Sequence, residues 1–326
     1  MGIKHLNRVF NQKCSDQAIY KLHLKHLSTK KIAVDASIFL YRFLGDDKLI
    51  EQMYLMVSIF RKYDIVPIFV FDGAAPPEKK ELLNERKEGK RKAEERYLEM
   101  KASVEQNTLE PDEKYEVELE MEQLKKQFIY IKDGDIKRVK HLLDICGISW
   151  VVARGEADEY CAHLIQTEQV YACLSEDMDM FAYGCCRIMR HFSMVKHSVL
   201  LYDLPEILRQ LGLNLREFRR ILVLSGTDYN KDEPTSLFDV LKWFEAYKAD
   251  TILLEKDVSF YDWIEANMKS RQNYNQLDKI YKMFVVVDKQ PPIHSANFEG
   301  ELKNRNVERG ELAKVLAEDG FLFPST

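Results

Sequence analysis

The chain has 326 residues, of which 46% are hydrophobic and 31% are charged, and its formal net charge is -5. A chain of this length buries one sizeable core, so we expect one large domain with a smaller helical appendage. The negative charge excludes a wholly basic protein that coats DNA, and any contact with nucleic acid has to come from local basic patches. No apolar run approaches the roughly 18 residues that span a bilayer, so we expect no membrane segment.

The six cysteines lack the paired spacing of a structural zinc site. Cys161 with His163, or Cys185 beside Cys186, could be imagined as zinc ligands, but free cysteines are commonly buried as small apolar side chains, and we expect buried thiols. No secretion signal precedes the first predicted element, and Leu6 stands where a myristoylation signal needs Ser or Thr. We therefore expect an intracellular protein in a reducing compartment.

The first predicted elements form a strand–helix–strand unit. Residues 31–35 and 67–72 are runs rich in β-branched and aromatic residues that each end in an aspartate, which indicates two buried parallel strands. Between them, residues 48–63 carry apolar side chains at helical spacing and supply the crossover helix. The same pattern returns over residues 148–152, 162–165 and 170–174. The chain is therefore expected to be an α/β protein with a mainly parallel sheet.

A stretch from about residue 78 to 126 interrupts this pattern. Nearly all its residues are charged or good helix formers, apart from a break near Pro111. It predicts long helices joined by a turn, which project from the sheet domain because they offer little to a core. A solvated helical hairpin without function explains the composition equally well. Beyond residue 230 we expect further short helices, including an amphipathic one that starts after Ser236.

Acidic residues follow predicted strands or apolar runs at five places. In open α/β sheets, ligands bind outside the carboxyl ends of the strands, so these acids face the expected site. A single such acid is more often a helix cap or a turn residue, but five groups favour a shared pocket. The acids are Asp35, Asp72, Glu156 with Asp158 or Glu159, Asp177 with Asp179, and Asp228. Spacing alone does not decide between Asp158 and Glu159.

Clustered carboxylates repel one another, and cations have to neutralise them. Oxygen ligands without accompanying histidines favour Mg²⁺ or Mn²⁺ over zinc. Two such ions can activate a water and stabilise the leaving oxygen of a phosphodiester. The acids therefore indicate a divalent-metal-dependent nuclease with two Mg²⁺ ions, which Mn²⁺ can replace.

Several ordered blocks resemble the flap endonucleases and Rad2-type (XPG) structure-specific 5′ nucleases. The blocks include Met1-Gly2-Ile3, Val34-Asp35-Ala36-Ser37, Val70-Phe71-Asp72-Gly73, Gly155-Glu156-Ala157-Asp158, Glu176-Asp177-Met178-Asp179, Met189-Arg190-His191 and Ser225-Gly226-Thr227-Asp228-Tyr229. The resemblance implies a PIN-like 5′-nuclease fold. Residues 1–230 would form its α/β core with a helical arch inserted at about 78–128, and residues 231–326 a divergent C-terminal helical region.

The resemblance also implies roles for individual residues. The metal ligands would be Asp35, Asp72, Glu156, Asp158, Asp177, Asp179 and Asp228, which selects Asp158 over Glu159. Gly2 would lie near the site, and Tyr41 would stack on a base beside the scissile phosphate, although an ordinary half-buried helix aromatic is the alternative for Tyr41.

In the arch, Lys80 with Arg86 or Lys87 would hold the scissile phosphate. Further cations expected at the DNA backbone are Lys79, Lys137, Arg138 and Lys140, the last three of which are equally well explained as a solvated helix face. Such contacts would make DNA binding sensitive to salt.

The sequence departs from the family pattern in two regions. Asp158 stands where flap endonucleases usually carry glutamate and where the 5′-to-3′ exonuclease branch carries aspartate. Residues 230–236 contain no glycine, whereas the family continues there with a Gly-rich helical hairpin that holds a monovalent cation and contacts the duplex. We therefore expect a weaker grip on the downstream duplex. A sliding-clamp box is also absent.

These features predict a structure-specific 5′ nuclease that cuts flap or branched DNA in replication and repair. We expect a divergent, monomeric member that acts in the nucleus or at a viral replication site. The alternatives are a 5′-to-3′ DNA exonuclease of the same superfamily and a non-catalytic protein that binds DNA junctions. A PIN-like ribonuclease fits less well, because the insertion and the number of acids exceed what that smaller fold requires.

Overall fold

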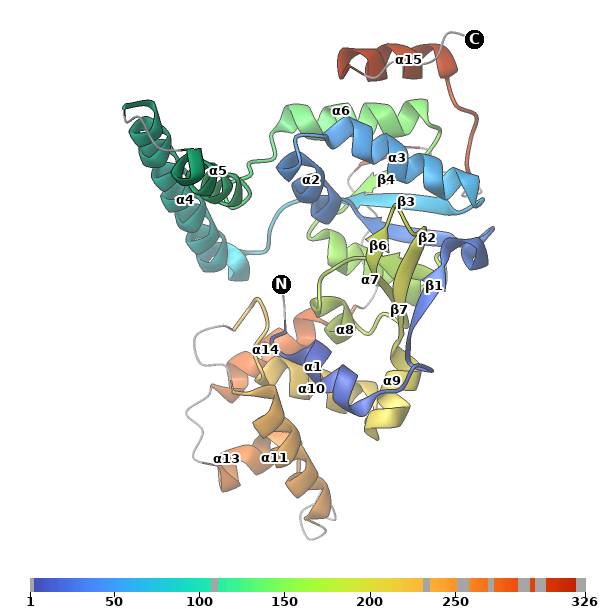
Figure 1. Cartoon of the computed structure of the whole chain (residues 1–326). Helices are drawn as coiled ribbons and strands as arrows, with labels where there is room; N and C mark the ends of the chain where they lie inside the picture. The colour runs from blue at the N-terminus through green and yellow to red at the C-terminus, as the bar shows by residue number, and fades with distance from the viewer. Residues whose placement is uncertain are drawn as a thin grey trace.

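The computed structural model of the chain describes residues 3–106, 111–230, 235–250, 258–268, 273–286, 294–296 and 303–320. Gly2, which the resemblance places near the site, lies outside these ranges. The body of the molecule is a β-sheet with helices on both faces, and a pair of helices projects from it (Figure 1). Within the described ranges, no helix is long and apolar enough to cross a membrane.

The sheet has the strand order β1-β7-β6-β5-β2-β3-β4-β8 in the part of the chain that the structure describes. The strands are β1 Ile19–His23, β2 Lys31–Asp35, β3 Val66–Phe71, β4 Ser149–Val152, β5 Ala172–Leu174, β6 Arg187–Ser193, β7 Ser198–Asp203 and β8 His294–Ala296. The strands from β6 to β4 pair in parallel, whereas β1, β7 and β8 pair antiparallel with their neighbours. This mainly parallel sheet confirms the predicted fold class.

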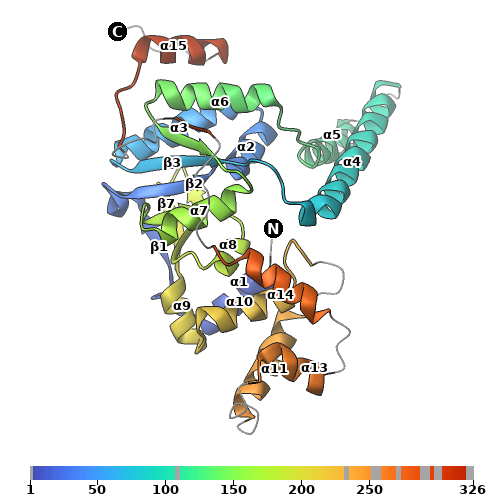
Figure 2. The same cartoon turned by 180° about the vertical axis from the view of Figure 1, so that it is seen from behind.

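Successive side chains of β2 enter two separate cores, as the pleat of a strand requires. Ile32 and Val34 pack with the helices α2, α3 and α6, whereas Ala33 packs with α7 and α8 on the other face (Figure 2). The helices of the body are α1 Leu6–Lys13, α2 Ala36–Gly45, α3 Leu49–Lys62, α6 Asp133–Ile145, α7 Ala157–Gln166, α8 Asp179–Tyr183, α9 Leu204–Leu211 and α10 Leu215–Leu224. A short 3₁₀ turn, η1 Leu24–Leu27, precedes β2.

The charged insertion folds as a 3₁₀ turn, η2 Pro77–Lys79, followed by the helices α4 Lys80–Gln106 and α5 Pro111–Lys125. The two helices pack against each other outside the sheet, where Arg96 pairs with Glu120 (Figure 2). Among the side chains described along these helices, the buried apolar ones are Leu82, Ala93 and Leu124. Exposed ion pairs contribute little stability, so the arch depends on its attachment at both ends.

The C-terminal helices pack onto the body. They are α11 Leu237–Ala249, α13 Phe260–Asn267, α14 Tyr274–Met283 and α15 Arg309–Glu318. Helices α11 and α14 contact α10, and α15 contacts α6. A division of the chain at residue 230 stays a prediction.

A close backbone approach joins the ends of β3 and β4. The Gly73 amide donates to the carbonyl of Gly155 at 2.8 Å, and the Ala74 amide donates to that of Arg154 at 3.1 Å. A Cβ on Gly73 would overlap the carbonyl oxygen of Ala153 and would lie 2.8 Å from that of Arg154. Because these are backbone atoms, only glycine permits this approach.

We predict that Gly73→Ala lowers the free energy of unfolding by about 2 kcal/mol or more, since the added methyl has to displace backbone. The matched control is Gly89→Ala, where a Cβ in α4 meets nothing within 4 Å and should add about 0.5–1 kcal/mol of stability. Urea titrations of the two variants measure both changes. A Gly73→Ala protein as stable as the parent would show that the two strand ends can separate freely.

Candidate active site

The seven predicted acids stand at one edge of the sheet, beyond the carboxyl ends of its parallel strands. Asp35 ends β2 and Asp72 follows β3. The others are Glu156 and Asp158 at the start of α7, Asp177 and Asp179 after β5, and Asp228 after α10. The apolar run before Asp228 is the end of a helix. The structure therefore brings together acids from five separate segments.

Two serines link the acids nearest the strands. The Ser37 hydroxyl donates to Asp72 Oδ2 at 2.5 Å, and its amide donates to Asp35 Oδ1 at 3.1 Å. The Ser175 hydroxyl donates to Asp35 Oδ2 at 3.0 Å and lies 3.5 Å from Asp158 Oδ1. One hydroxyl thus bridges two carboxylates.

Helix N-termini also anchor these acids. Asp35 is the N-cap of α2, and Asp72 Oδ1 accepts a hydrogen bond of 2.8 Å from the amide of Ala157, the first residue of α7. Helix N-termini favour negative charge, which offsets part of the repulsion between the carboxylates.

The electrostatics show that the acids act on one another. Burial, followed by the charges of Asp72 and Asp177, raises the pKa of Asp35 to about 7. Burial, followed by Asp35 and Asp177, raises the pKa of Asp158 well above its usual range. Burial, followed by Asp177 and Asp228, raises the pKa of Asp179 in the same way. Burial and the neighbouring acids therefore both disfavour the ionised form of these three carboxyl groups.

Asp179 is the least compensated of these acids. Its side chain is 3% exposed, and neither carboxylate oxygen has a hydrogen-bond partner. Its backbone amide donates to Asp177 Oδ1 at 2.9 Å, which fixes the turn that carries both aspartates. A buried carboxylate without donors is costly unless a cation reaches it.

Lys79 is a cation inside the pocket. Its side chain is buried, and its Nζ donates to Glu156 Oε1 at 2.6 Å. Tyr229 donates to the other oxygen, Oε2, at 2.6 Å, and its ring centre lies 4.7 Å from the same Nζ. Burial is the largest single influence and lowers the pKa of Lys79, but the charge and hydrogen bond of Glu156 together with the charges of Asp179 and Asp228 leave this pKa raised. Lys79 therefore stays charged beside Glu156.

Arg86 supplies the second cation. Its Nη2 lies 2.7 Å from Asp228 Oδ2. Lys80 and Lys87 are exposed and form no ion pair with the described residues, whereas Lys79, at the end of the 3₁₀ turn Pro77–Lys79, pairs with Glu156. The structure thus places Lys79 and Arg86 among the acids, whereas the choice of phosphate-binding cations in the arch stays a prediction.

The C-terminal region reaches the back of this pocket. The Phe284 ring packs edge-on against Tyr183, with centroids 4.9 Å apart, and against Tyr229, with centroids 5.5 Å apart. Because Tyr229 donates a hydrogen bond to Glu156, Phe284 supports the site through this tyrosine.

The remaining predicted residues lie outside the acid pocket. Tyr41 is exposed on α2. On α6, Lys137 is exposed, Arg138 pairs with Asp319 at 2.5 Å, and the Lys140 ammonium lies 4.6 Å from the ring centre of Trp150. Contacts of these α6 residues with DNA stay a prediction.

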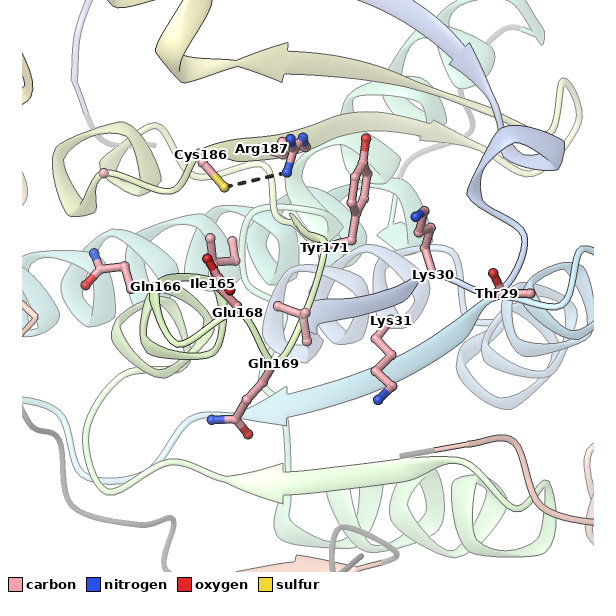
Figure 3. A pocket seen from close by; sticks show the side chains of 12 residues that line it. Thr29, Lys30, Lys31, Ile165, Gln166, Glu168, Gln169, Tyr171, Cys186 and Arg187 are labelled. Atoms are coloured by element: carbon pink, nitrogen blue, oxygen red, sulfur yellow. Dashed lines mark hydrogen bonds between the residues drawn. The ribbon is translucent and has the colours of Figure 1, made fainter. Parts of the chain in front are cut away.

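A hollow of about 580 Å³ lies at the opposite edge of the sheet (Figure 3). It is lined by Lys31 at the start of β2, Tyr171 before β5 and Arg187 at the start of β6. These are the amino ends of the parallel strands, where ligands of open sheets rarely bind. The acid pocket at the carboxyl edge is therefore the better candidate for catalysis.

The donor set of the acid pocket fits a divalent cation. All its potential ligands are carboxylate oxygens, which Mg²⁺ and Mn²⁺ prefer, and the two oxygens of Asp179 lack partners. In the described part of the chain, no three such side chains are gathered tightly enough to hold an ion as they stand. Lys79 and Arg86 occupy part of the space among them as counter-ions.

Four of the six cysteines are buried as expected, whereas Cys14 and Cys186 are only partly buried. Cys146, Cys161, Cys173 and Cys185 are buried, and all six cysteines are free. Burial raises the pKa of the Cys161 and Cys173 thiols. These buried thiols therefore stay protonated and behave as small apolar side chains.

Comparisons with known proteins define the class. Residues 1–93 match the XPG N-terminal domain, and residues 147–228 match the XPG I-region. Flap endonuclease 1 of Encephalitozoon cuniculi is 31% identical over 247 residues, which cover 70% of this chain and 68% of that protein. Flap endonuclease 1 of Methanococcus aeolicus is 27% identical over 311 residues, which cover 90% and 87%.

A solved structure shares the fold. The catalytic core of Rad2 in complex with DNA substrate superimposes with a TM-score of 0.63 at 20% identity, and the match covers 95% of this chain and 93% of that one. The chain therefore belongs to the XPG family of Rad2- and flap-endonuclease-type structure-specific 5′ nucleases. It is a phosphodiester hydrolase of this family, whose members use divalent metals.

We predict that Asp179→Asn stabilises the metal-free protein, because it removes an uncompensated buried charge without changing the shape of the side chain. The midpoint of thermal unfolding in EDTA should rise by about 2 °C or more. Added Mg²⁺ should raise the midpoint of the parent protein by more than that of the variant, because ligands stabilise the state that binds them.

The matched control is Asp16→Asn, which neutralises an exposed aspartate. Its midpoint should stay within about 1 °C of the parent in both buffers, since isolated surface charges contribute little. A lower midpoint for Asp179→Asn in EDTA would show that this carboxylate is already well compensated.

Proposed function

We propose that the acid pocket cuts the phosphodiester backbone of 5′-flap DNA near the junction of single and double strand, with two Mg²⁺ ions that Mn²⁺ can replace. The observation that carries the proposal is the pair of unpartnered, buried oxygens of Asp179. They lie within a cluster of acids in which, among the described residues, the cations paired with the acids are Lys79 and Arg86. Such a pocket has a strong electrostatic demand for further positive charge.

The ligands of the ions would be Asp35, Asp72, Glu156, Asp158, Asp177, Asp179 and Asp228. When bound, two divalent ions activate a water and stabilise the leaving oxygen of the phosphodiester. Ser37 and Ser175 would hold the carboxylate rotamers through their hydrogen bonds to Asp35 and Asp72. Ligands fixed in this way lose little entropy on binding.

Lys79 and Arg86 would bind the scissile phosphate. Each cation is held by a single carboxylate partner at the foot of the arch, and phosphate oxygens can replace that partner. The planar guanidinium of Arg86 can donate two parallel hydrogen bonds to one phosphate, whereas Lys79 acts as a point charge. Lys80 and Lys87, which are exposed on α4, would contact phosphates further from the scissile bond.

Tyr229 would position Lys79. Its hydroxyl donates to Glu156, which also accepts from the Lys79 ammonium, and its ring lies beside that ammonium.

The proposal further includes a single strand that passes beside or through the arch formed by α4 and α5. It also includes action by a monomer in the nucleus or at a viral replication site. The likeness to structures of Rad2 with DNA supports the nucleic-acid substrate.

A 5′-to-3′ exonuclease of the same superfamily is the second candidate. The observation that favours it is Asp158, which is shorter by one methylene than the glutamate that flap endonucleases usually carry. A protein that binds junctions without cutting them is the third.

The test compares the products from a 5′-flap and from a blunt duplex in Mg²⁺. We predict that oligonucleotides are released from the flap, and that Asp179→Ala cuts about 100-fold more slowly or worse while it still binds. Asp16→Ala is the matched control and should cut like the parent. Mononucleotide products would favour the exonuclease, and binding without cutting would favour the non-catalytic protein. Undiminished cutting by Asp179→Ala would remove this residue from the site.

A further inference from the structure

Among the phenylalanine, tyrosine and tryptophan side chains that the structure describes, the exposed ones are Tyr41 and Tyr130, each 43% exposed. Tyr41 lies on α2, and Tyr130 lies in the segment between α5 and α6. Both rings contact one cation, because the Lys90 Nζ on α4 is 4.6 Å from the ring centre of Tyr41 and 5.4 Å from that of Tyr130. Two exposed rings that converge on one ammonium offer both a flat aromatic surface and a positive charge, which suits a ligand with an aromatic ring and a phosphate.

The surroundings hold this group in place. The Lys90 Nζ donates to the carbonyl oxygen of Ile129 at 2.7 Å, and the Tyr130 hydroxyl donates to Glu94 Oε2 at 3.0 Å. The Ile129 side chain lies so near Gly45, at the end of α2, that a Cβ there would come within 2.8 Å of its Cδ1. The segment that carries Tyr130 is thus seated against the helix that carries Tyr41.

Lys90 and the two rings lie next along α4 after Arg86, which pairs with an acid of the pocket. Arg86 pairs with Asp228, and Lys90 follows four residues later on the same face of α4, about 6 Å further along its axis. Tyr41 follows Asp35 on α2 by less than two helical turns. A strand whose phosphate lies at Arg86 would therefore place its next nucleotide at Lys90 and the two rings.

We propose that Tyr41, Lys90 and Tyr130 form a two-ring binding site for one nucleotide of the single-stranded arm, in which Tyr130 stacks on the base and Lys90 neutralises its phosphate. The inference rests on the proposed function and adds Tyr130 and Lys90 to it. Every base has a flat aromatic face, so stacking on tyrosine holds single strands without regard to sequence. The cation–π contacts keep Lys90 between the rings until a phosphate draws it away.

The test measures dissociation constants in the Asp179→Ala background, so that the substrate stays intact. One 5′-flap substrate carries natural bases, and a second carries abasic residues in the flap next to the junction. Tyr130→Ala should weaken binding of the natural flap about five-fold or more and leave binding of the abasic flap unchanged. Tyr130→Leu, which keeps bulk without a π face, should behave like Tyr130→Ala, and Tyr130→Phe like the parent.

Lys90→Met provides the complementary variant, since it keeps the apolar stem and removes the charge. It should weaken binding of both flaps equally and reduce the slope of log Kd against log salt by about one. Leu98→Ala is the matched control, because Leu98 is exposed further along α4, and it should bind both flaps like the parent.

Equal weakening of both flaps by Tyr130→Ala, or no weakening of either, would overturn the inference. The thermal midpoint of the variant shows that an unfolded protein is not the cause. Cutting of flap DNA by the parent protein is measured separately. A parent that cuts flaps while Tyr130→Ala binds normally rejects the stacking site alone, whereas a parent that does not cut rejects the proposed function.

Discussion

Repulsion among buried carboxylates is the constraint on which the rest of the site depends. Burial and neighbouring charges both raise the pKa of Asp35, Asp158 and Asp179, so folding of the bare chain works against these groups. The surrounding fold offsets that cost only in part. Helix N-termini, two serine hydroxyls and two cations contact other acids, while the oxygens of Asp179 keep no partner. Carboxylates that lack compensating partners favour the binding of cations, and bound cations in turn attract a phosphate.

Topology explains how distant acids meet. The carboxyl ends of parallel strands lie at the same edge of a sheet. The acids that end or follow β2, β3, β4 and β5 therefore lie along this edge. Lys79 and Arg86, at the start of the helical insertion, contact Glu156 and Asp228. Phe284, directly after α14, packs against Tyr229. In the proposed function, the sheet carries the metal ligands and the insertion carries the cations that bind the phosphate. Cations on α4 continue outward from the acids toward Tyr41 and Tyr130.

The strands that end in Asp35 and Asp72 could be predicted because an apolar run and its terminal acid are local features. The run before Asp228 is ambiguous, since four apolar residues fit a helix or a strand equally well. A signal for the helix does exist, because Asn214 and Glu217 form a capping box at the start of α10. Lys79, and not Lys80, points inward because it contacts Glu156 and Tyr229. Both partners are distant in the sequence, so no local pattern predicts this choice. Strands β6 and β7 pair antiparallel across a bulge and were not predicted.

The most direct measurement of the central claim is anomalous diffraction from crystals grown with Mn²⁺. If the uncompensated acids exist to hold divalent cations, two manganese peaks should lie in the pocket, with carboxylate oxygens of Asp35 and Asp179 among their ligands. Lys79 and Arg86 should then have moved away from Glu156 and Asp228. A pocket without manganese, with both ion pairs intact at saturating Mn²⁺, would contradict the account.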